Sequence, residues 1–91
     1  MKQIVIEVAP RTQAGEYHAS CLDAWGCGKS IEEAVASVIA TAHDKLQLTT
    51  NDLTYANKDF HPHIVRLRRL INLLSERGLT VEIRFIPLES R

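Results

Sequence analysis

Hydrophobic and polar residues alternate along two stretches near the start of the chain, and a period of two predicts β-strands. The first stretch covers residues 3–9 and the second covers residues 16–21. Between them, residues 12–15 have the composition of a turn. Because the connection is short, the two strands should form an antiparallel hairpin. Residues 22–28, which contain two glycines, fit either a structured loop or a brief third strand, and we favour the strand.

After Ser30, apolar residues recur at helical spacing. Ser30 and Glu33 have the spacing of a capping box. The sequence predicts a helix over residues 31–46, with apolar residues three and four positions apart on one face. These residues are Ile31, Ala34, Val35, Val38, Ala42 and Leu46. Residues 49–59 are polar and rich in turn-forming residues, so a connecting loop is expected there.

A second helix should begin near Pro62 and end before Gly78. Phe60 and Val65 have the spacing of a hydrophobic staple across its start. Its expected buried face consists of Ile64, Leu67, Leu70, Ile71 and Leu74. The clearest alternation in the chain follows at residues 79–85 and predicts the last strand.

This order of elements, β-β-(β)-α-α-β, predicts a single α+β domain over residues 1–91. We expect an antiparallel sheet of three to four strands with two helices packed on one face. Eleven basic and eleven acidic residues give a formal net charge of zero, so any attraction to nucleic acid must be local. The chain has no apolar run long enough for a signal peptide or a membrane span, and Cys21 and Cys27 lack metal-knuckle spacing. A cytoplasmic protein is therefore expected.

Three motifs follow one another in the first half of the chain. They are Gly15-Glu16-Tyr17-His18-Ala19, Asp23-Ala24-Trp25-Gly26-Cys27 and Gly28-Lys29-Ser30-Ile31-Glu32-Glu33-Ala34. Together they resemble the HicB antitoxin family, which has a strand with Y-x-A, then P-D-L-P-G-C, then G-x-T-x-E-E-A at the start of a helix. The resemblance covers residues 4–46, about half of the chain.

The resemblance implies a partial ribonuclease-H-like sheet and a protein that binds and neutralises a small RNA-cleaving toxin. Leu22 and Trp25 stand where the family has prolines, and the residues usual between Cys27 and Gly28 are missing. The second half predicts one helix and one strand where the family typically has a DNA-binding segment. The resemblance therefore does not extend to DNA repression.

Residues that could carry catalysis form no recognisable motif. The four histidines are His18, His43, His61 and His63. No carboxylate or cysteine stands at metal-ligand spacing near His61 and His63, and ordinary surface or boundary histidines are expected. The acids available to a nuclease-type metal site are Glu7, Glu16 and Asp23, and the pattern does not bring three acids together. We expect a non-enzymatic protein without a metal or a cofactor.

The second predicted helix is locally basic. Its charged residues after the first turn are Arg66, Arg68, Arg69, Glu76 and Arg77. On a helical projection, the residues outside the buried arc include Val65, Arg66, Arg69 and Leu73. They form either a solvated face or an interface in which arginines meet an acidic protein surface or RNA phosphates. Trp25, the only tryptophan, either closes one end of the core or anchors a partner.

Three functions follow from these alternatives. The first is a HicB-like antitoxin that binds a small protein, with candidate binding residues Trp25, Val65, Arg66, Arg69 and Leu73. The second is an RNA-binding module that uses Arg66, Arg68 and Arg69, with or without Trp25. The third is an adaptor dimer. A homodimer is expected in any case if residues 79–86 lie at a sheet edge, where free backbone groups can pair with a second copy.

Overall fold

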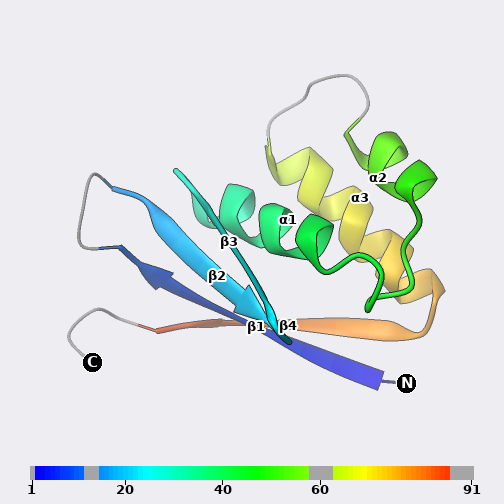
Figure 1. Ribbon diagram of the computed structural model, residues 1–91, viewed down its shortest axis with the longest axis horizontal. Helices are drawn as coiled ribbons and strands as arrows, with labels where there is room; N and C mark the ends of the chain where they lie inside the picture. Colours follow the sequence, from blue (N-terminus) through cyan, green and yellow to red (C-terminus); the bar gives the residue numbers. More distant parts are fainter. Residues whose placement is uncertain (1, 12–14, 58–62, 87–91) are drawn as a thin grey trace.

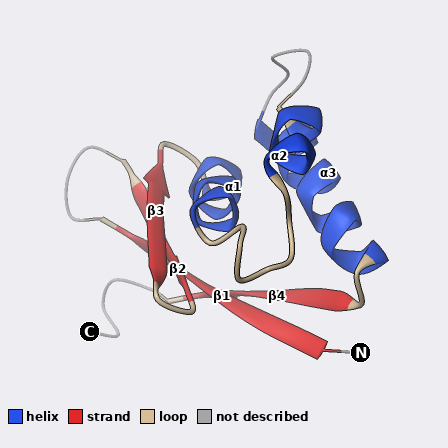
Figure 2. Cartoon of the chain, turned by 45° about the vertical axis from the view of Figure 1, so that its right-hand side comes forward, coloured by secondary structure: helices blue, strands red, loops and turns tan. Residues whose placement is uncertain are grey.

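The computed structural model describes residues 2–11, 15–57 and 63–86 and shows an α+β fold. The strands are β1 (Lys2–Pro10), β2 (Tyr17–Cys21), β3 (Ala24–Gly28) and β4 (Leu79–Phe85). The helices are α1 (Ile31–Thr41), α2 (Thr50–Ala56) and α3 (His63–Glu76). The described helices lie on the same side of the sheet (Figure 1, Figure 2). The expected fold class, with helices on one face of the sheet, is confirmed.

The sheet is mixed, with the strand order β3-β2-β1-β4. The short connections make β1–β2 and β2–β3 antiparallel, as expected. β4 instead runs parallel to β1, with Ile4 opposite Val81 and Ile6 opposite Ile83. The prediction of a wholly antiparallel sheet is therefore wrong. The chain crosses the helical layer between β3 and β4, and a crossover of this kind allows the returning strand to run parallel to its neighbour.

The core lies between the sheet and the helices, with buried residues from both α1 and α3. Ile6 and Val8 of β1 have no exposed surface, and neither do Val35 and Val38 of α1. The alternation in β1 thus places its apolar face under the helices, as the period of two predicts. The opposite face of the sheet is not covered by any described element.

α1 begins as the capping residues predict and ends earlier than expected. The Ser30 hydroxyl accepts a hydrogen bond from the Glu33 backbone N–H at 3.1 Å. The helix stops at Thr41, and residues 42–47 form successive turns, so the predicted extension to Leu46 is wrong. Leu46, within these turns, and Leu48, just after them, are both buried in the core.

The segment expected to be a loop contains α2. Its first turn has a complete capping box, in which the Thr49 hydroxyl accepts from the Asp52 N–H and the Asp52 carboxylate accepts from the Thr49 N–H. Ala56 is buried in the core and Leu53 packs against it. The loop prediction is wrong because two apolar contacts and a cap are enough for a helix this short when it packs on α3.

α3 ends at Glu76, and Gly78 follows with φ 80°, so the predicted stop is confirmed. Ile64 was expected in the buried face but is 49 % exposed, because it lies in the first turn, where α3 is farthest from the sheet (Figure 1). Phe60, Pro62 and residues 12–14 lie outside the described residues. Among the described helices, none combines the length and the hydropathy needed to cross a membrane.

Candidate partner-binding surface

The β2–β3 hairpin forms one end of the sheet, and its side chains alternate between two faces. Ala19, Cys21 and Gly26 are buried on the side of α1. A side chain at Gly26 would have no room, because its Cβ would lie 2.7 Å from the Ser37 Oγ and 2.8 Å from the Val38 nitrogen. Gly26 therefore faces α1. Because successive residues of a strand point to opposite faces of the sheet, the preceding residue, Trp25, points to the open face.

Trp25 is 62 % exposed on this open face, and its ring stacks on the imidazole of His18. The ring centroids are 5.6 Å apart and the planes make an angle of 24°. The two residues are diagonal neighbours across the hairpin, since His18 pairs with Cys27 and Ser20 pairs with Trp25. The alternative in which Trp25 closes one end of the core is therefore wrong. The structure leaves the indole available to a partner.

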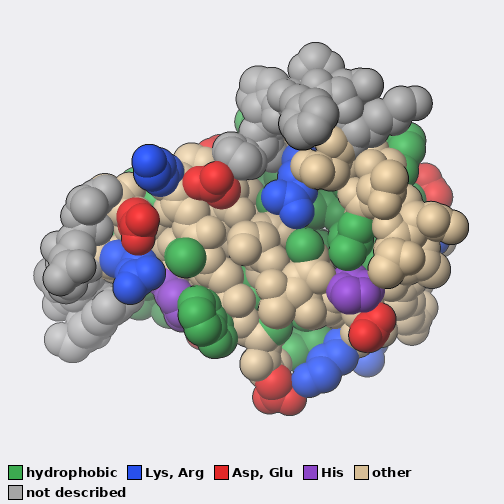
Figure 3. Space-filling view, turned by 45° about the horizontal axis from the view of Figure 1, so that its top comes forward, with side chains coloured by type: hydrophobic (Ala, Val, Ile, Leu, Met, Phe, Trp, Pro, Cys, Tyr) green, Lys and Arg blue, Asp and Glu red, His purple; other side chains and the backbone are tan. Residues whose placement is uncertain are grey.

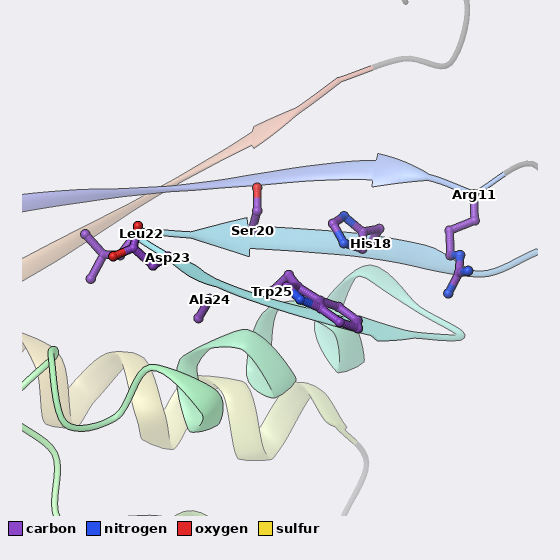
Figure 4. Close-up of a pocket in the computed structure, with 7 residues that line it drawn as sticks. All are labelled: Arg11, His18, Ser20, Leu22, Asp23, Ala24 and Trp25. Carbon is purple, nitrogen blue, oxygen red and sulfur yellow. The ribbon is translucent and has the colours of Figure 1, made fainter.

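A hollow of about 650 Å³ lies beside this aromatic pair (Figure 4). Its lining residues are Arg11, His18, Ser20, Leu22, Asp23, Ala24 and Trp25. Figure 4 shows Arg11 near the aromatic pair and Asp23 at the hairpin turn. The hollow therefore offers an aromatic surface flanked by a cation and an anion.

Both charged residues of the hollow are held by ion pairs. Arg11 Nη1 is 3.6 Å from Glu16 Oε1, and Lys45 Nζ is 2.9 Å from Asp23 Oδ2. The hydrogen bond and charge of Lys45 lower the pKa of Asp23, so this carboxylate is ionised at neutral pH. Glu16 and Asp23, two of the acids considered for a nuclease site, each face a different cation and do not converge.

A second hollow, of about 470 Å³, lies between β3 and the end of α1. Its lining residues are Asp23, Ala24, Trp25, Thr41, Ala42, Asp44 and Lys45. It shares Asp23, Ala24 and Trp25 with the first hollow, so Trp25 stands between two depressions. Because β3 is also an edge strand, a bound partner could contact both hollows and the strand edge at once.

The other predicted site residues lie apart from Trp25. Val65, Arg66, Arg69 and Leu73 are on α3, which packs against α1, α2 and β4, whereas Trp25 is on β3 at the opposite end of the sheet. On the face seen in Figure 3, acidic and basic side chains are interspersed. The structure therefore does not assemble the five candidate residues into one surface.

α2 occupies part of the α3 face that was considered for binding. The Arg69 guanidinium lies 5.5 Å from the centre of the Tyr55 ring and donates to the Tyr55 carbonyl at 3.4 Å. Leu73, expected outside the buried arc, is half-buried against the core. Arg77 pairs with Asp52 at 3.0 Å. The helix that the sequence did not reveal thus accounts for the positions of Arg69 and Arg77.

His18 stacks on Trp25, and His43 follows the end of α1. His43 Nδ1 is 2.8 Å from the Ala40 carbonyl oxygen, and its Nε2 is 3.1 Å from Asp44 Oδ1. Among residues 2–11, 15–57 and 63–86, no three His, Cys, Asp or Glu side chains are placed to hold a metal ion. His61 and the side chain of His63 lie outside the described part of the chain.

The two cysteines differ in their surroundings. Cys21 is buried, and this burial raises the pKa of its thiol, whereas Cys27 is exposed on the open face.

Comparisons with known proteins identify no relative: no family model, no curated protein and no solved structure matches this chain.

Proposed function

We propose that this chain is a non-enzymatic, HicB-like binding protein of the antitoxin type. Its partner is a small protein of the RNA-cleaving toxin class, bound on the open face of the sheet around Trp25. The observation that supports this proposal most directly is the exposure of Trp25, which is 62 % accessible and braced by His18. Tryptophan is among the residues most enriched at protein-binding hot spots, because a partner can remove its large apolar surface from water.

The environment of Trp25 suits a protein partner. The hollows on both sides of the indole have mixed character, with Arg11 and Asp23 at the first and Asp44 and Lys45 at the second. Protein interfaces commonly combine an aromatic anchor with a polar rim of this kind. The free edge of β3 adds backbone groups that can pair with an extended segment of the partner.

The alternative of RNA binding by α3 has less support. Arg69 and Arg77 contact α2, which leaves Arg66 and Arg68 as the basic residues of α3 without a described role. At about 100° per residue, side chains two positions apart point in widely different directions, so Arg66 and Arg68 do not make one basic face. Phosphate binding gains from several cations that act together.

We also place a homodimer contact at β4, the edge strand opposite β3. Because the two edges are separated by β2 and β1, a second copy at β4 leaves the surface around Trp25 open in both copies. The antitoxin-type function and dimer formation are then compatible.

The proposal is tested by photo-cross-linking from position 25 in the cells that naturally make the chain. A photoreactive phenylalanine derivative replaces Trp25, and a control chain carries it in place of Tyr55 of α2, which is similarly exposed at 55 %. We expect one small protein to be cross-linked from position 25 and not from position 55. The captured protein should cleave RNA, and the wild-type chain should inhibit that cleavage.

Trp25→Ala should weaken binding of the captured protein by about 30-fold or more, as expected for a hot-spot residue. Its fold should persist, since removing one exposed cross-strand pair costs at most about 1 kcal/mol. Cross-links to RNA alone, or equal capture from both positions, would show that the proposal is wrong.

A further inference from the structure

The outer edge of β4 presents a defined set of backbone groups. The Gly78 carbonyl accepts from the Lys2 N–H at 3.0 Å, and the Ile86 N–H donates to the Val8 carbonyl at 2.7 Å. Backbone groups alternate in direction along a strand, so residues with even numbers face β1. The N–H and C=O groups of Val81, Ile83 and Phe85 therefore point away from the sheet.

The apolar side chains of the same strand are only partly covered. Leu79, at the start of β4, is buried, whereas Ile83 is 40 % exposed and Phe85 is 51 % exposed. The register with β1 places Ile83 beside Ile6 and Phe85 beside Val8, on the helix side of the sheet. They are exposed because α3 covers the start of β4 and then rises away from the sheet (Figure 1). β4 thus combines outward-facing backbone groups with the exposed apolar side chains of Ile83 and Phe85.

We infer that β4 pairs antiparallel with β4 of a second copy, about a two-fold axis that passes through Ile83. In this register Ile83 exchanges backbone hydrogen bonds with the partner's Ile83. Val81 exchanges them with the partner's Phe85, and Phe85 with the partner's Val81. All the outward-facing groups of this segment are then satisfied. The inference names the dimer contact in residue detail and does not depend on the toxin-type partner.

The side chains of β4 are complementary to themselves in this register. On the helix side, Val81 lies opposite the partner's Phe85, and the two copies of Ile83 meet at the axis. On the open side, Glu82 lies opposite the partner's Arg84, and Arg84 opposite the partner's Glu82. Glu82 and Arg84 are neighbours on the open face and form an ion pair within the chain, so both charges are already on the correct side.

Other registers lack this complementarity. Directly opposite residues of an antiparallel pair share a face, so the axis must pass through a residue, not between two. An axis at Glu82 would oppose the two copies of Glu82, and an axis at Arg84 would oppose two arginines, which is unfavourable for directly opposed residues. An axis at Val81 or Phe85 leaves both charges without an opposite charge. Among these positions, only an axis at Ile83 places Glu82 opposite the partner's Arg84 and Arg84 opposite the partner's Glu82.

Charge exchange at Glu82 and Arg84 tests the contact. The wild-type chain should sediment with twice the 10.2 kDa mass of one chain at micromolar concentration. Glu82→Arg and Arg84→Glu should each raise the dissociation constant of the dimer about tenfold or more, because each opposes like charges. An equimolar mixture of the two variants should form a heterodimer, in which every opposed pair is attractive. The double variant E82R/R84E should regain the wild-type dimer.

A cysteine at the axis tests the register. In a Cys27→Ser background, Ile83→Cys should form an intermolecular disulfide under mild oxidation, since directly opposed Cα atoms lie about 5.5 Å apart. Val81→Cys should not, because its two copies are offset along the strands. A monomeric wild-type chain, absence of the heterodimer, or cross-linking through Val81→Cys in preference to Ile83→Cys would overturn the inference. Trp25→Ala should leave the dimer intact, so this test is separate from that of partner binding.

Discussion

Arg77, just after α3, donates from Nη2 to both carboxylate oxygens of Asp52, at 3.1 and 3.0 Å. Asp52 is also the third residue of α2, and its carboxylate accepts a hydrogen bond from the Thr49 N–H at 2.8 Å. The Asp52 carboxylate thus caps the first turn of α2 and also links α2 to Arg77, the residue that follows α3. α2 keeps its place over α3 partly because of this double role.

The Asp52 contacts predict how stability depends on pH. The backbone hydrogen bond from Thr49, with a contribution from Arg77, lowers the pKa of Asp52 below its usual 3.8. A carboxyl whose pKa is lower in the folded state stabilises the fold above its unfolded pKa, and this stabilisation is lost as the pH falls through the folded pKa. We expect Asp52→Asn to flatten the fall in the free energy of unfolding below about pH 4. Urea unfolding at a series of pH values measures this.

The matched control for this prediction is Arg77→Met. It removes the cation and keeps the hydrogen bond from Thr49, which has the larger effect on the pKa of Asp52. It should therefore retain most of the wild-type pH dependence. If the free energy of unfolding of Asp52→Asn fell with pH as steeply as that of the wild type, Asp52 would not contribute to the pH dependence.

Gly26→Ala should destabilise the fold by about 1–3 kcal/mol, the usual cost of overpacking a filled core. The added Cβ would come within 2.8 Å of the Val38 backbone nitrogen, so β3 and α1 would have to separate. Cys27→Ala, next along the strand and exposed, should have little effect. Chemical denaturation of the two variants measures the difference, and equal stability would show that β3 and α1 are not in such close contact.

Leu22→Gly should stabilise the protein by roughly 0.5–1 kcal/mol. Leu22 begins the two-residue turn between β2 and β3 with φ 56°, a left-handed conformation. This conformation costs a residue with a side chain about 1–2 kcal/mol, and the greater freedom of glycine in the unfolded chain offsets part of the gain. Leu22→Ala retains the unfavourable φ and should bring no gain in thermal stability. A lower melting temperature for Leu22→Gly would contradict the prediction.

Much of the fold follows from local sequence. Residues 3–9 and 79–85 were predicted as strands, and the structure has β1 over Lys2–Pro10 and β4 over Leu79–Phe85. Ser30 begins α1, as its spacing to Glu33 predicts. These features depend on neighbours two to four positions apart, which is the range over which side-chain alternation and capping act.

The pairing of β4 with β1 could not be predicted in the same way. Alternation determines which side chains share a face, but it is the same for a parallel and an antiparallel neighbour. α2 was missed because its first turn is polar, although Thr49 and Asp52 have the spacing of a capping box. That spacing was the available signal.

The candidate site was only partly visible in the sequence. Trp25 stood out as the only tryptophan, but its contact with His18 depends on the hairpin register. A two-residue turn at Leu22 and Asp23 implies that Ser20 opposes Trp25 and that His18 is its diagonal neighbour. The arginines in and just after α3 could not be interpreted without α2, because Tyr55 and Asp52, which Arg69 and Arg77 contact, lie on that helix.

The parallel pairing of β1 with β4 also constrains the order in which a nascent chain can mature. Gln3 and Glu82 are hydrogen-bonded although they are 79 positions apart. While the ribosome is still adding residues, β1 can pair with β2, but its other edge has no neighbour until β4 has been synthesised. A translation product interrupted before Leu79 therefore exposes a strand whose second neighbour has never been made, and it should be a substrate for aggregation or degradation.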